Sequence, residues 1–311
     1  MSPGSHVTVM KEEALDLLQV RQGGRYIDGT VGLGGHTEAM LERSSPDGCV
    51  LGIDRDEKAL KLASERLARF KSRVVLVHGN YADIVDIAEN ASFTGVDGIL
   101  LDLGVSSMQL DEGERGFSFM RDGPLDMRMD TSRGPTAADL VNTCPEKALA
   151  DIIFRYGEES ASRRIAAAIV RERENAPITT TARLAAIVSQ AKGGRHGRIH
   201  PATQTFQALR MAVNEELEGV ERGAEGALSV LRPGGRLAVI SFHSLEDRAV
   251  KQLFKRHEAR EESLPQGGSR PVGEHPRVKR VNRKSISAGP AEVRDNPRAR
   301  SARLRAVQVV E

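Results

Sequence analysis

The feature that most constrains the fold is a series of short apolar segments that each end in a polar residue. Four such segments end at positions 28, 54, 78 and 102. The spacing of about 25 residues between successive ends accommodates one strand and one helix. Because the segments are apolar almost throughout, both faces of the sheet should be covered, which is typical of parallel strands. We predict strands at Arg25–Asp28, Cys49–Asp54, Val74–His78 and Val96–Asp102.

Further helices and a fifth strand extend the pattern after a long interruption. Residues 56–70 have apolar side chains at helical spacing, and a fifth strand is predicted at Leu237–Ile240 after a turn at Pro233–Gly235 that ends a helix. The stretch between the fourth and fifth strands is too long for a loop. It shows helical spacing instead, at residues 145–156, 160–174, 179–192 and 202–217.

These elements predict an α/β chain with a mostly parallel, doubly wound sheet and an inserted all-helical domain. We expect residues 1–112 to form the first part of the core and 113–213 the helical insertion. Residues 214–311 would complete the core and end in a basic segment. A long insertion is compatible with an intact core, because the entropy cost of closing a loop grows slowly with its length.

Composition and charge narrow the classes of function. The net charge is only +2, but residues 270–305 carry 11 Lys and Arg against 3 Asp and Glu. This basic segment indicates a polyanionic partner, and the alternative is a solvated, poorly ordered tail. Cys49 and Cys144 have no zinc-ligand spacing, and neither a signal peptide nor an apolar run of membrane-spanning length is evident. We therefore expect a cytoplasmic protein without a metal site.

A glycine-rich loop follows the first predicted strand. Residues 28–36 contain four glycines, which let the backbone approach a ligand, and a helix beginning near His36 would offer free N–H groups. The third glycine of a dinucleotide fingerprint is missing and there is no P-loop lysine. The loop is similar to that of S-adenosylmethionine methyltransferases, and the alternative is a tight turn that needs glycine for its shape.

One residue at the end of the second strand and one after the third strand extend the candidate site. Asp54 can accept hydrogen bonds from both ribose hydroxyls, or it can be a surface residue that begins a helix. Tyr81 can lie against an adenine ring, or it can be a half-buried packing residue. Asp54 does not distinguish S-adenosylmethionine from a nicotinamide cofactor.

The ends of the fourth and fifth strands carry the candidate catalytic residues. Asp102 can accept a hydrogen bond from an exocyclic amine during methyl transfer, or it can hold the methionine end of the cofactor. His243 can contact the substrate, orient Asp102 or bind phosphate, and its alternative role is structural. For RNA phosphates the candidates are Arg298, Arg300, Arg303 and Arg305.

Taken together, the motifs resemble the MraW/RsmH family of ribosomal RNA small-subunit methyltransferases. The most specific are Leu125–Asp130 and Ser241–Arg248, and others lie at residues 6–10, 28–36, 102–109, 115–119 and 296–302. The resemblance implies a Rossmann-like class I methyltransferase core, S-adenosylmethionine as cofactor and N4 of a cytidine in the decoding region as target. It implies cofactor contacts at Gly34, Gly35, His36, Asp54, Tyr81, Asp102 and Gln109.

Two other classes of function stay open at this point. A nicotinamide-dependent oxidoreductase would suit the glycine loop and Asp54, although no catalytic Tyr-x-x-x-Lys pair is present. A non-catalytic RNA-binding assembly factor would keep the fold without the reaction. The expected partner is small-subunit ribosomal RNA or the small subunit itself, with a homodimer as a further expectation.

Overall fold

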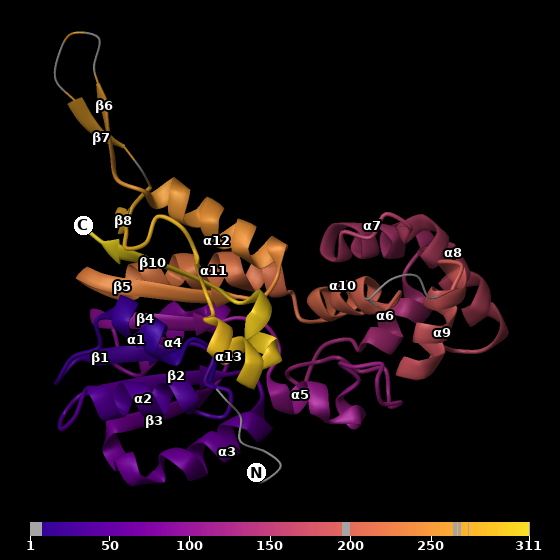
Figure 1. Cartoon of the computed structure of the whole chain (residues 1–311), viewed down its shortest axis with the longest axis horizontal. Coiled ribbons are helices and arrows are strands. Elements are labelled where there is room, and N and C mark those ends of the chain that lie inside the picture. The colour runs from indigo at the N-terminus through magenta and orange to yellow at the C-terminus, as the bar shows by residue number, and fades with distance from the viewer. Residues whose placement is uncertain (1–7, 195–199, 264–265, 267–268, 273, 311) are drawn as a thin grey trace. The chain divides into compact units, whose positions relative to one another are not determined.

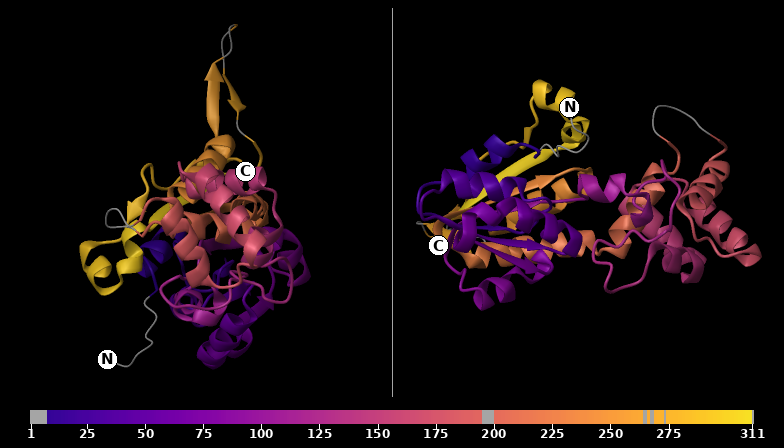
Figure 2. Two further views of the ribbon diagram at one scale, coloured as in Figure 1. Left: turned by 90° about the vertical axis from the view of Figure 1, so that its right-hand side faces the viewer. Right: turned by 90° about the horizontal axis from the view of Figure 1, so that it is seen from below.

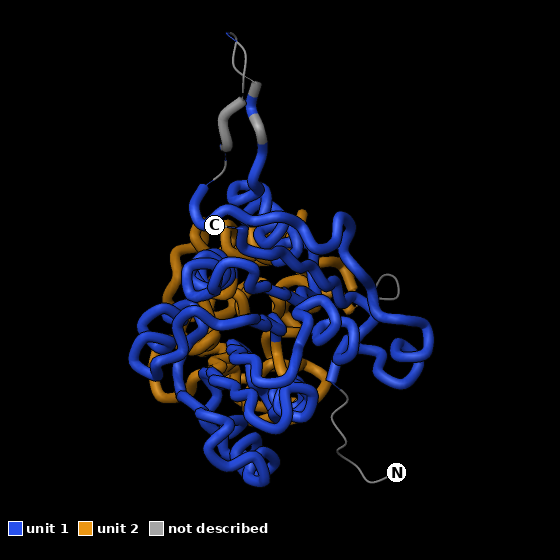
Figure 3. Tube along the Cα trace, turned by 90° about the vertical axis from the view of Figure 1, so that its left-hand side faces the viewer, with its two compact units in different colours: residues 1–104, 217–311 blue, residues 105–216 orange. Residues whose placement is uncertain are grey.

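The computed structural model describes residues 8–194, 200–263, 266, 269–272 and 274–310. The chain forms two compact units (Figure 3): unit 1 comprises residues 1–104 and 217–311, and unit 2 comprises residues 105–216. Unit 1 is therefore built from two distant stretches of chain. The helical insertion that the sequence predicts, at 113–213, lies within unit 2.

A mixed sheet forms the centre of unit 1 (Figure 1). Its strand order is β3-β2-β1-β4-β5-β10-β8, and β9 pairs with β10. The strands from β3 to β5 are parallel, whereas β10 is antiparallel to β5 and to β8. The predicted α/β class and its doubly wound sheet are confirmed. The strand bounds are β1 Arg25–Asp28, β2 Cys49–Asp54, β3 Val74–His78, β4 Val96–Asp102, β5 Leu231–Ser241, β8 Val278–Arg280, β9 Ile286–Ser287 and β10 Arg303–Val309.

Helices cover both faces of this sheet (Figures 1 and 2). Successive strand residues point to opposite faces, so Tyr26 and Leu100 enter one core, and Ile27 and Ile99 enter the other. The first core is packed by α1 Lys11–Leu18, α2 Gly35–Arg43 and α3 Glu57–Leu67. The second is packed by α4 Ile84–Asn90, α11 Glu216–Val230 and α12 Ser244–His257. Burial on both faces explains why the strands are apolar runs rather than alternating ones.

The fifth strand begins earlier than predicted. β5 starts at Leu231, which pairs with Val96, and the next pair joins Arg236 to Gly98. The four residues between Leu231 and Arg236 therefore lie opposite a single residue of β4 and form a bulge, in which Gly234 has φ +81°. The predicted turn at Pro233–Gly235 is thus a bulge within the strand, and the predicted start at Leu237 was wrong.

The basic C-terminal segment is folded over its described residues. It contributes β8, β9, α13 Pro290–Asp295, the 3₁₀ helix η4 Pro297–Ser301 and β10. At its start, β7 Ser269–Val272 pairs with the preceding β6 Arg260–Ser263 as an antiparallel hairpin that projects from unit 1 (Figures 1 and 2). The alternative of a poorly ordered tail therefore does not hold for residues 274–310.

Unit 2 is helical and has its own apolar core, which includes Ile153, Ile165 and Leu209. The predicted helix at 202–217 stops at Val213, because Glu215 adopts the left-handed region with φ +50°. The helices are α5 Ser107–Asp111, α6 Ala137–Thr143, α7 Glu146–Gly157, α8 Ser162–Asn175, α9 Thr181–Ala191 and α10 Thr203–Val213. Over the described parts of both units, no helix has the length and apolar character needed to cross a membrane.

Candidate functional site

The strand order of unit 1 reverses between β1 and β4, and the glycine loop and Asp102 lie at the carboxyl ends of these two strands. Chains that leave adjacent strands in opposite directions open a crevice there, which is where α/β sheets bind ligands. Thr30, just after β1, accepts a hydrogen bond from the backbone N–H of Asp102 at 2.6 Å. Gly29 N–H donates to the carbonyl of Leu100 at 2.9 Å. These bonds join the two strand ends.

Asp28, the last residue of β1, is a fully buried carboxylate. Its Oδ1 accepts from the N–H of Thr30 at 3.1 Å, and its Oδ2 accepts from the hydroxyl of Thr37 at 2.7 Å. Burial raises the pKa of Asp28 to about 6, although these hydrogen bonds oppose the shift. Asp28 therefore ties the start of α2 to β1.

The glycine loop brings backbone and carboxylate together as expected. Gly32 N–H donates to Oδ2 of Asp54 at 2.6 Å, and Oδ1 of Asp54 accepts from Asp56 N–H at 2.9 Å. Gly32 and Gly34 adopt φ values of +52° and +82°, which side chains disfavour. No described atom lies within 4 Å of where a Cβ on Gly32 would stand. The loop thus leaves open space beside Asp54.

Asp56, and not Asp54, caps the N-terminus of α3. Oδ1 of Asp56 accepts from the N–H groups of Lys58 and Ala59. Asp56 therefore has the helix-capping role that was the alternative for Asp54. Burial raises the pKa of Asp54 above its ordinary value.

Asp102 and His36 face each other at the switch point. His36 lies in the first turn of α2, its Nδ1 is 3.6 Å from Oδ2 of Asp102, and its Nε2 is 3.0 Å from the carbonyl of Val9. Oδ1 of Asp102 is buried and has no hydrogen-bond partner among the described residues, although 23% of the side chain is exposed. Burial, followed by the charges of Asp28 and Glu246, raises the pKa of Asp102 well above its ordinary value. An added cation would therefore be favourable here.

His243 is the N-cap of α12. Its Nδ1 accepts from the N–H of Glu246 at 3.4 Å, and its Nε2 lies 3.1 Å from Oε1 of Glu246. The ring–carboxylate distance suits an ion pair, but its angles do not meet hydrogen-bond geometry. Glu246 is almost fully buried and accepts from Phe242 N–H at 2.8 Å. His243 thus caps α12, and its contact with the substrate stays a prediction.

Tyr81 begins the short 3₁₀ helix η2, Tyr81–Asp83, after β3. A Cβ on Gly223 of α11 would stand 2.3 Å from Cδ2 of its ring, so the ring packs closely on this glycine. Tyr81 is half-buried against the second core. The packing role is therefore real, and the adenine contact stays a prediction.

Gln109 belongs to unit 2, in helix α5. It closes a capping box with Ser106: the Ser106 hydroxyl accepts from Gln109 N–H at 3.2 Å, and Gln109 Oε1 accepts from Ser106 N–H at 3.0 Å. Gln109 is 4% exposed. Its contact with cofactor stays a prediction.

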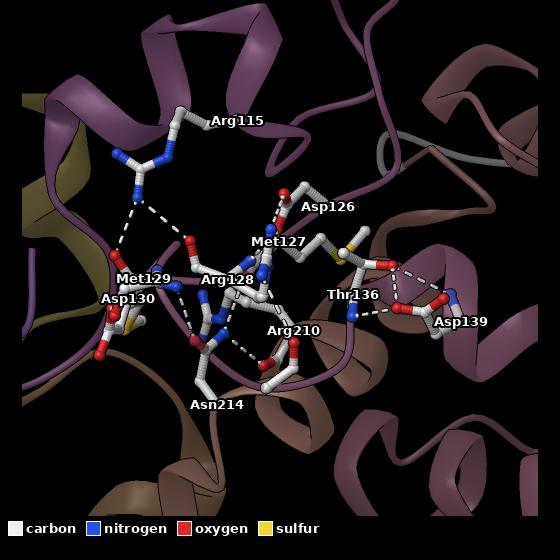
Figure 4. Close-up of polar contacts among 12 residues, drawn as sticks. Arg115, Asp126, Met127, Arg128, Met129, Asp130, Thr136, Asp139, Arg210 and Asn214 are labelled. Carbon is white, nitrogen blue, oxygen red and sulfur yellow. Dashed lines mark hydrogen bonds and ion pairs between the residues drawn. The ribbon is translucent and has the colours of Figure 1, made fainter.

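The Leu125–Asp130 motif organises unit 2 (Figure 4). Leu125, Met127 and Met129 are buried, whereas Asp126 and Arg128 form a bidentate ion pair with two bonds of 2.8 Å. Burial alone would raise the pKa of Asp126, but the hydrogen bonds from Arg128 lower it below its ordinary value. The polar residues of the motif therefore serve internal order.

Asn214 clamps this motif from the end of α10 (Figure 4). Its Oδ1 accepts from Met129 N–H at 2.8 Å, and its Nδ2 donates to the carbonyls of Met127 at 2.8 Å and Arg210 at 2.9 Å. Arg115 donates to the carbonyls of Arg128 and Met129 at 3.1 and 3.0 Å. The sequence did not single out Asn214.

The four predicted phosphate-binding arginines differ in their surroundings. Arg305, in β10, forms a bidentate ion pair with Asp247 at 2.7 and 2.9 Å, and Arg303 donates to the hydroxyl of Ser287. Arg298 and Arg300 lie exposed in η4. Arg305 is therefore occupied within the fold.

Sequence reasoning missed three contributors to the site. Asp28, Thr37 and Glu246 are buried polar residues around Asp102 or α2. A carboxylate at the end of β1, as at the ends of β2 and β4, was the signal that could have identified Asp28.

The MraW methylase family matches residues 4–310. Ribosomal RNA small subunit methyltransferase H of Citrifermentans bemidjiense is 52% identical over 310 residues, which cover 98% of each chain. The protein of that name from Symbiobacterium thermophilum is 52% identical over 304 residues, covering 97% of this chain and 96% of the relative. An rRNA methylase structure from Streptococcus thermophilus aligns with 99% of this chain and 100% of its own, at a TM-score of 0.43 and 10% identity, too distant to add to the assignment. The match over nearly the whole length shows that this chain belongs to the MraW methylase family.

Proposed function

We propose that this methyltransferase uses S-adenosylmethionine to methylate N4 of a cytidine in the decoding region of small-subunit ribosomal RNA. The observation that carries the proposal is the group of carboxylates at the switch point, with Oδ1 of Asp102 buried and lacking a described hydrogen-bond partner. The names of the relatives support the RNA substrate. A ribosomal RNA substrate in turn supports a cytoplasmic location, whereas a homodimer stays a prediction.

The residues present fit this cofactor. It carries positive charge on its ammonium and sulfonium groups, and Asp28 and Asp102 offer negative charge that burial has made costly. Asp54 and the space beside Gly32 suit the ribose. Gly34, Gly35 and His36 at the start of α2, with Tyr81 and Gln109, are the further proposed contacts.

Asp102 is the proposed acceptor for the target amine. When bound, S-adenosylmethionine supplies an electrophilic methyl group. In this reaction the exocyclic amine would gain a carbon–nitrogen bond as the bond between the methyl carbon and sulfur breaks, with S-adenosylhomocysteine as the leaving group. The amine would also lose one proton, so a carboxylate that accepts its N–H bond can take that proton. The positive charge of the bound cofactor would lower the raised pKa of Asp102, so that the carboxylate is ionised and can accept the proton. His243 is proposed as a positioning residue that acts through Glu246.

Unit 2 and the η4 segment are proposed to hold RNA. A base in structured RNA must leave its stack to reach an enclosed site, so the surrounding backbone has to be held elsewhere. Arg298 and Arg300 are exposed and suit phosphate binding.

The test uses ribosomal RNA and small subunits from cells that lack this protein. Each is incubated with the purified full chain and labelled S-adenosylmethionine, and the modified nucleotide is mapped by mass spectrometry. We expect one labelled cytidine with the methyl group on N4. Absence of label with both substrates, or label on another atom, contradicts the proposal. Stabilisation by NAD and not by S-adenosylhomocysteine in a thermal-shift assay would favour an oxidoreductase instead.

A further inference from the structure

We propose that unit 1 has a structural site for a divalent transition-metal ion such as Zn²⁺, formed by Glu225, His257 and Glu274. One nitrogen of His257 and one oxygen of each carboxylate lie within 4.8 Å of one another. Glu225 projects from α11, His257 is the last residue of α12, and Glu274 precedes β8. The proposal does not depend on the function proposed above.

The orientation of His257 is the first argument. The residue is fully buried, and its Nδ1 lies 3.2 and 3.1 Å from the carbonyl oxygens of Glu274 and Pro276. Carbonyl oxygens only accept hydrogen bonds, so Nδ1 carries the proton. In the neutral ring the lone pair is then on Nε2. A backbone carbonyl that holds the other ring nitrogen is the usual arrangement behind a metal-binding histidine.

The surroundings of Nε2 are the second argument. This nitrogen is buried and has no hydrogen-bond partner among the described residues, yet it lies on the side of the two carboxylates. Its distance to Oε2 of Glu274 is 3.7 Å, longer than a hydrogen bond. Two ligands that each lie about 2.1 Å from a tetrahedral Zn²⁺ are roughly 3.4 Å apart. The observed distance therefore suits two ligands of one ion better than a direct bond.

The ligand set determines the class of ion. One imidazole and two carboxylates favour Zn²⁺ or Mn²⁺ over Mg²⁺ or Ca²⁺, which prefer oxygen ligands alone. Arg256 Nε also lies 3.7 Å from Oε2 of Glu274, so the guanidinium must share or yield this oxygen when the ion binds. Glu225 and Glu274 are exposed, which gives the ion a path of entry.

The site would join three segments far from the reaction. His257 lies at the opposite end of α12 from Ser244, and a helix of 14 residues is about 20 Å long. The ion would therefore fix the end of α12 to α11 and to the segment before β8 rather than take part in methyl transfer.

The experiment uses the full chain after treatment with a chelator and dialysis. Zn²⁺, Mn²⁺ and Mg²⁺ are titrated separately by calorimetry, and the Tm is measured with and without each ion. We expect one equivalent of Zn²⁺ to bind and to raise the Tm, with Mg²⁺ without effect. Bound Co²⁺ should show no thiolate charge-transfer band, because the site contains no cysteine.

Variants separate this site from adventitious binding. His257→Gln and Glu225→Gln should each weaken the Kd for Zn²⁺ at least about tenfold and abolish the rise in Tm, because each removes a direct ligand. His78→Gln and Glu89→Gln, both exposed and outside the cluster, should bind as the natural chain does. If His257→Gln fails to fold, the exposed Glu225→Gln decides. The proposal is overturned if the natural chain binds no Zn²⁺ saturably, or if Glu225→Gln binds it undiminished.

Discussion

Oδ2 of Asp102, at the end of β4, lies 3.6 Å from Nδ1 of His36, at the start of α2. The two side chains come from opposite sides of the point where strand order reverses. The pKa of Asp102 is raised by burial and by Asp28 and Glu246, which makes the pair sensitive to any added charge. The first prediction concerns this pair.

Asp102→Asn should lower kcat by about 100-fold or more, because an amide cannot take a proton from the target amine. The Tm should stay the same or rise, since a neutral amide is less costly to bury than a carboxylate. Methyl incorporation and the Kd for S-adenosylhomocysteine are measured together. Asp151→Asn, on the exposed side of α7, is the control. Normal turnover would remove Asp102 from the mechanism, and a large loss of cofactor affinity with intact kcat would assign it to cofactor binding instead.

Asp28 should make the stability of unit 1 depend on pH. Its folded pKa of about 6 exceeds the ordinary value of 3.8, so the folded state holds this proton more tightly than the unfolded chain. Its contribution to stability is therefore full below about pH 4, falls as the pH rises to about 6 and is absent above. The raised pKa corresponds to a free energy of unfolding that is lower by about 3 kcal/mol at neutral pH than at acid pH. This loss is the penalty for burying the ionised carboxylate.

Asp28→Asn should relieve that penalty, because the amide is neutral at every pH and its oxygen can still accept from Thr30 N–H. The Tm of the variant relative to the natural chain should increase between pH 4 and pH 7. Part of the gain would come from Asp102, whose pKa Asp28 raises. A Tm difference that is constant over this range contradicts the assignment.

Substitutions at His243 distinguish a helix-capping role of its side chain from contact with the substrate. His243→Ala should cost about 1 kcal/mol of stability, because α12 loses its N-cap. His243→Asn restores a capping acceptor, and we expect it to recover both the Tm and most of the methyltransferase activity. Recovery of the Tm without activity would show instead that the imidazole itself is required.

Asn214→Ala should destabilise unit 2 by about 3 kcal/mol, because Met129 N–H and Met127 carbonyl would lose their buried partners. Hydrogen exchange at residues 125–130 should accelerate more than exchange in the sheet of unit 1. Asn175→Ala, exposed at the end of α8, should change stability by less than about 0.5 kcal/mol. Equal effects of the two substitutions would argue against a clamp.

Arg298→Gln combined with Arg300→Gln should raise the KM for RNA and reduce its salt dependence, with kcat and the Tm nearly unchanged. Arg305→Gln should leave the KM for RNA nearly unchanged. It should lower the Tm, because Asp247 loses its bidentate partner. Salt titrations of RNA binding check the first pair, and thermal unfolding checks the second substitution. If Arg305→Gln alone changes RNA affinity, the assignments are exchanged.

The parts of the fold that could be predicted depend on local patterns. Apolar runs that end in polar residues identified β1 to β4 with their observed bounds. The ends of these runs pointed to the glycine loop, Asp54 and Asp102 as candidate residues. β10 was hidden because Arg303 and Arg305 alternate with buried Leu304 and Ala306, so a half-buried strand was interpreted as a basic tail.

The site contacts required tertiary structure. The bonds from Thr37 to Asp28 and from Gly32 to Asp54 join residues on different elements, and no spacing rule predicts such pairs. His243 shows the same limitation, since its capping bond to Glu246 needs a helix that begins at Ser244. Residue type alone did not distinguish capping from catalysis.

The interrupted order of unit 1 has a consequence for biosynthesis. β4 leaves the ribosome about 130 residues before β5, its partner in the sheet, so the edge of β4 stays unpaired while all of unit 2 is translated. Unpaired edges attract other strands. Early folding of unit 2, which has its own core, would shorten the remaining gap for β5 and limit the time in which a nascent chain exposes that edge to its neighbours on a polysome.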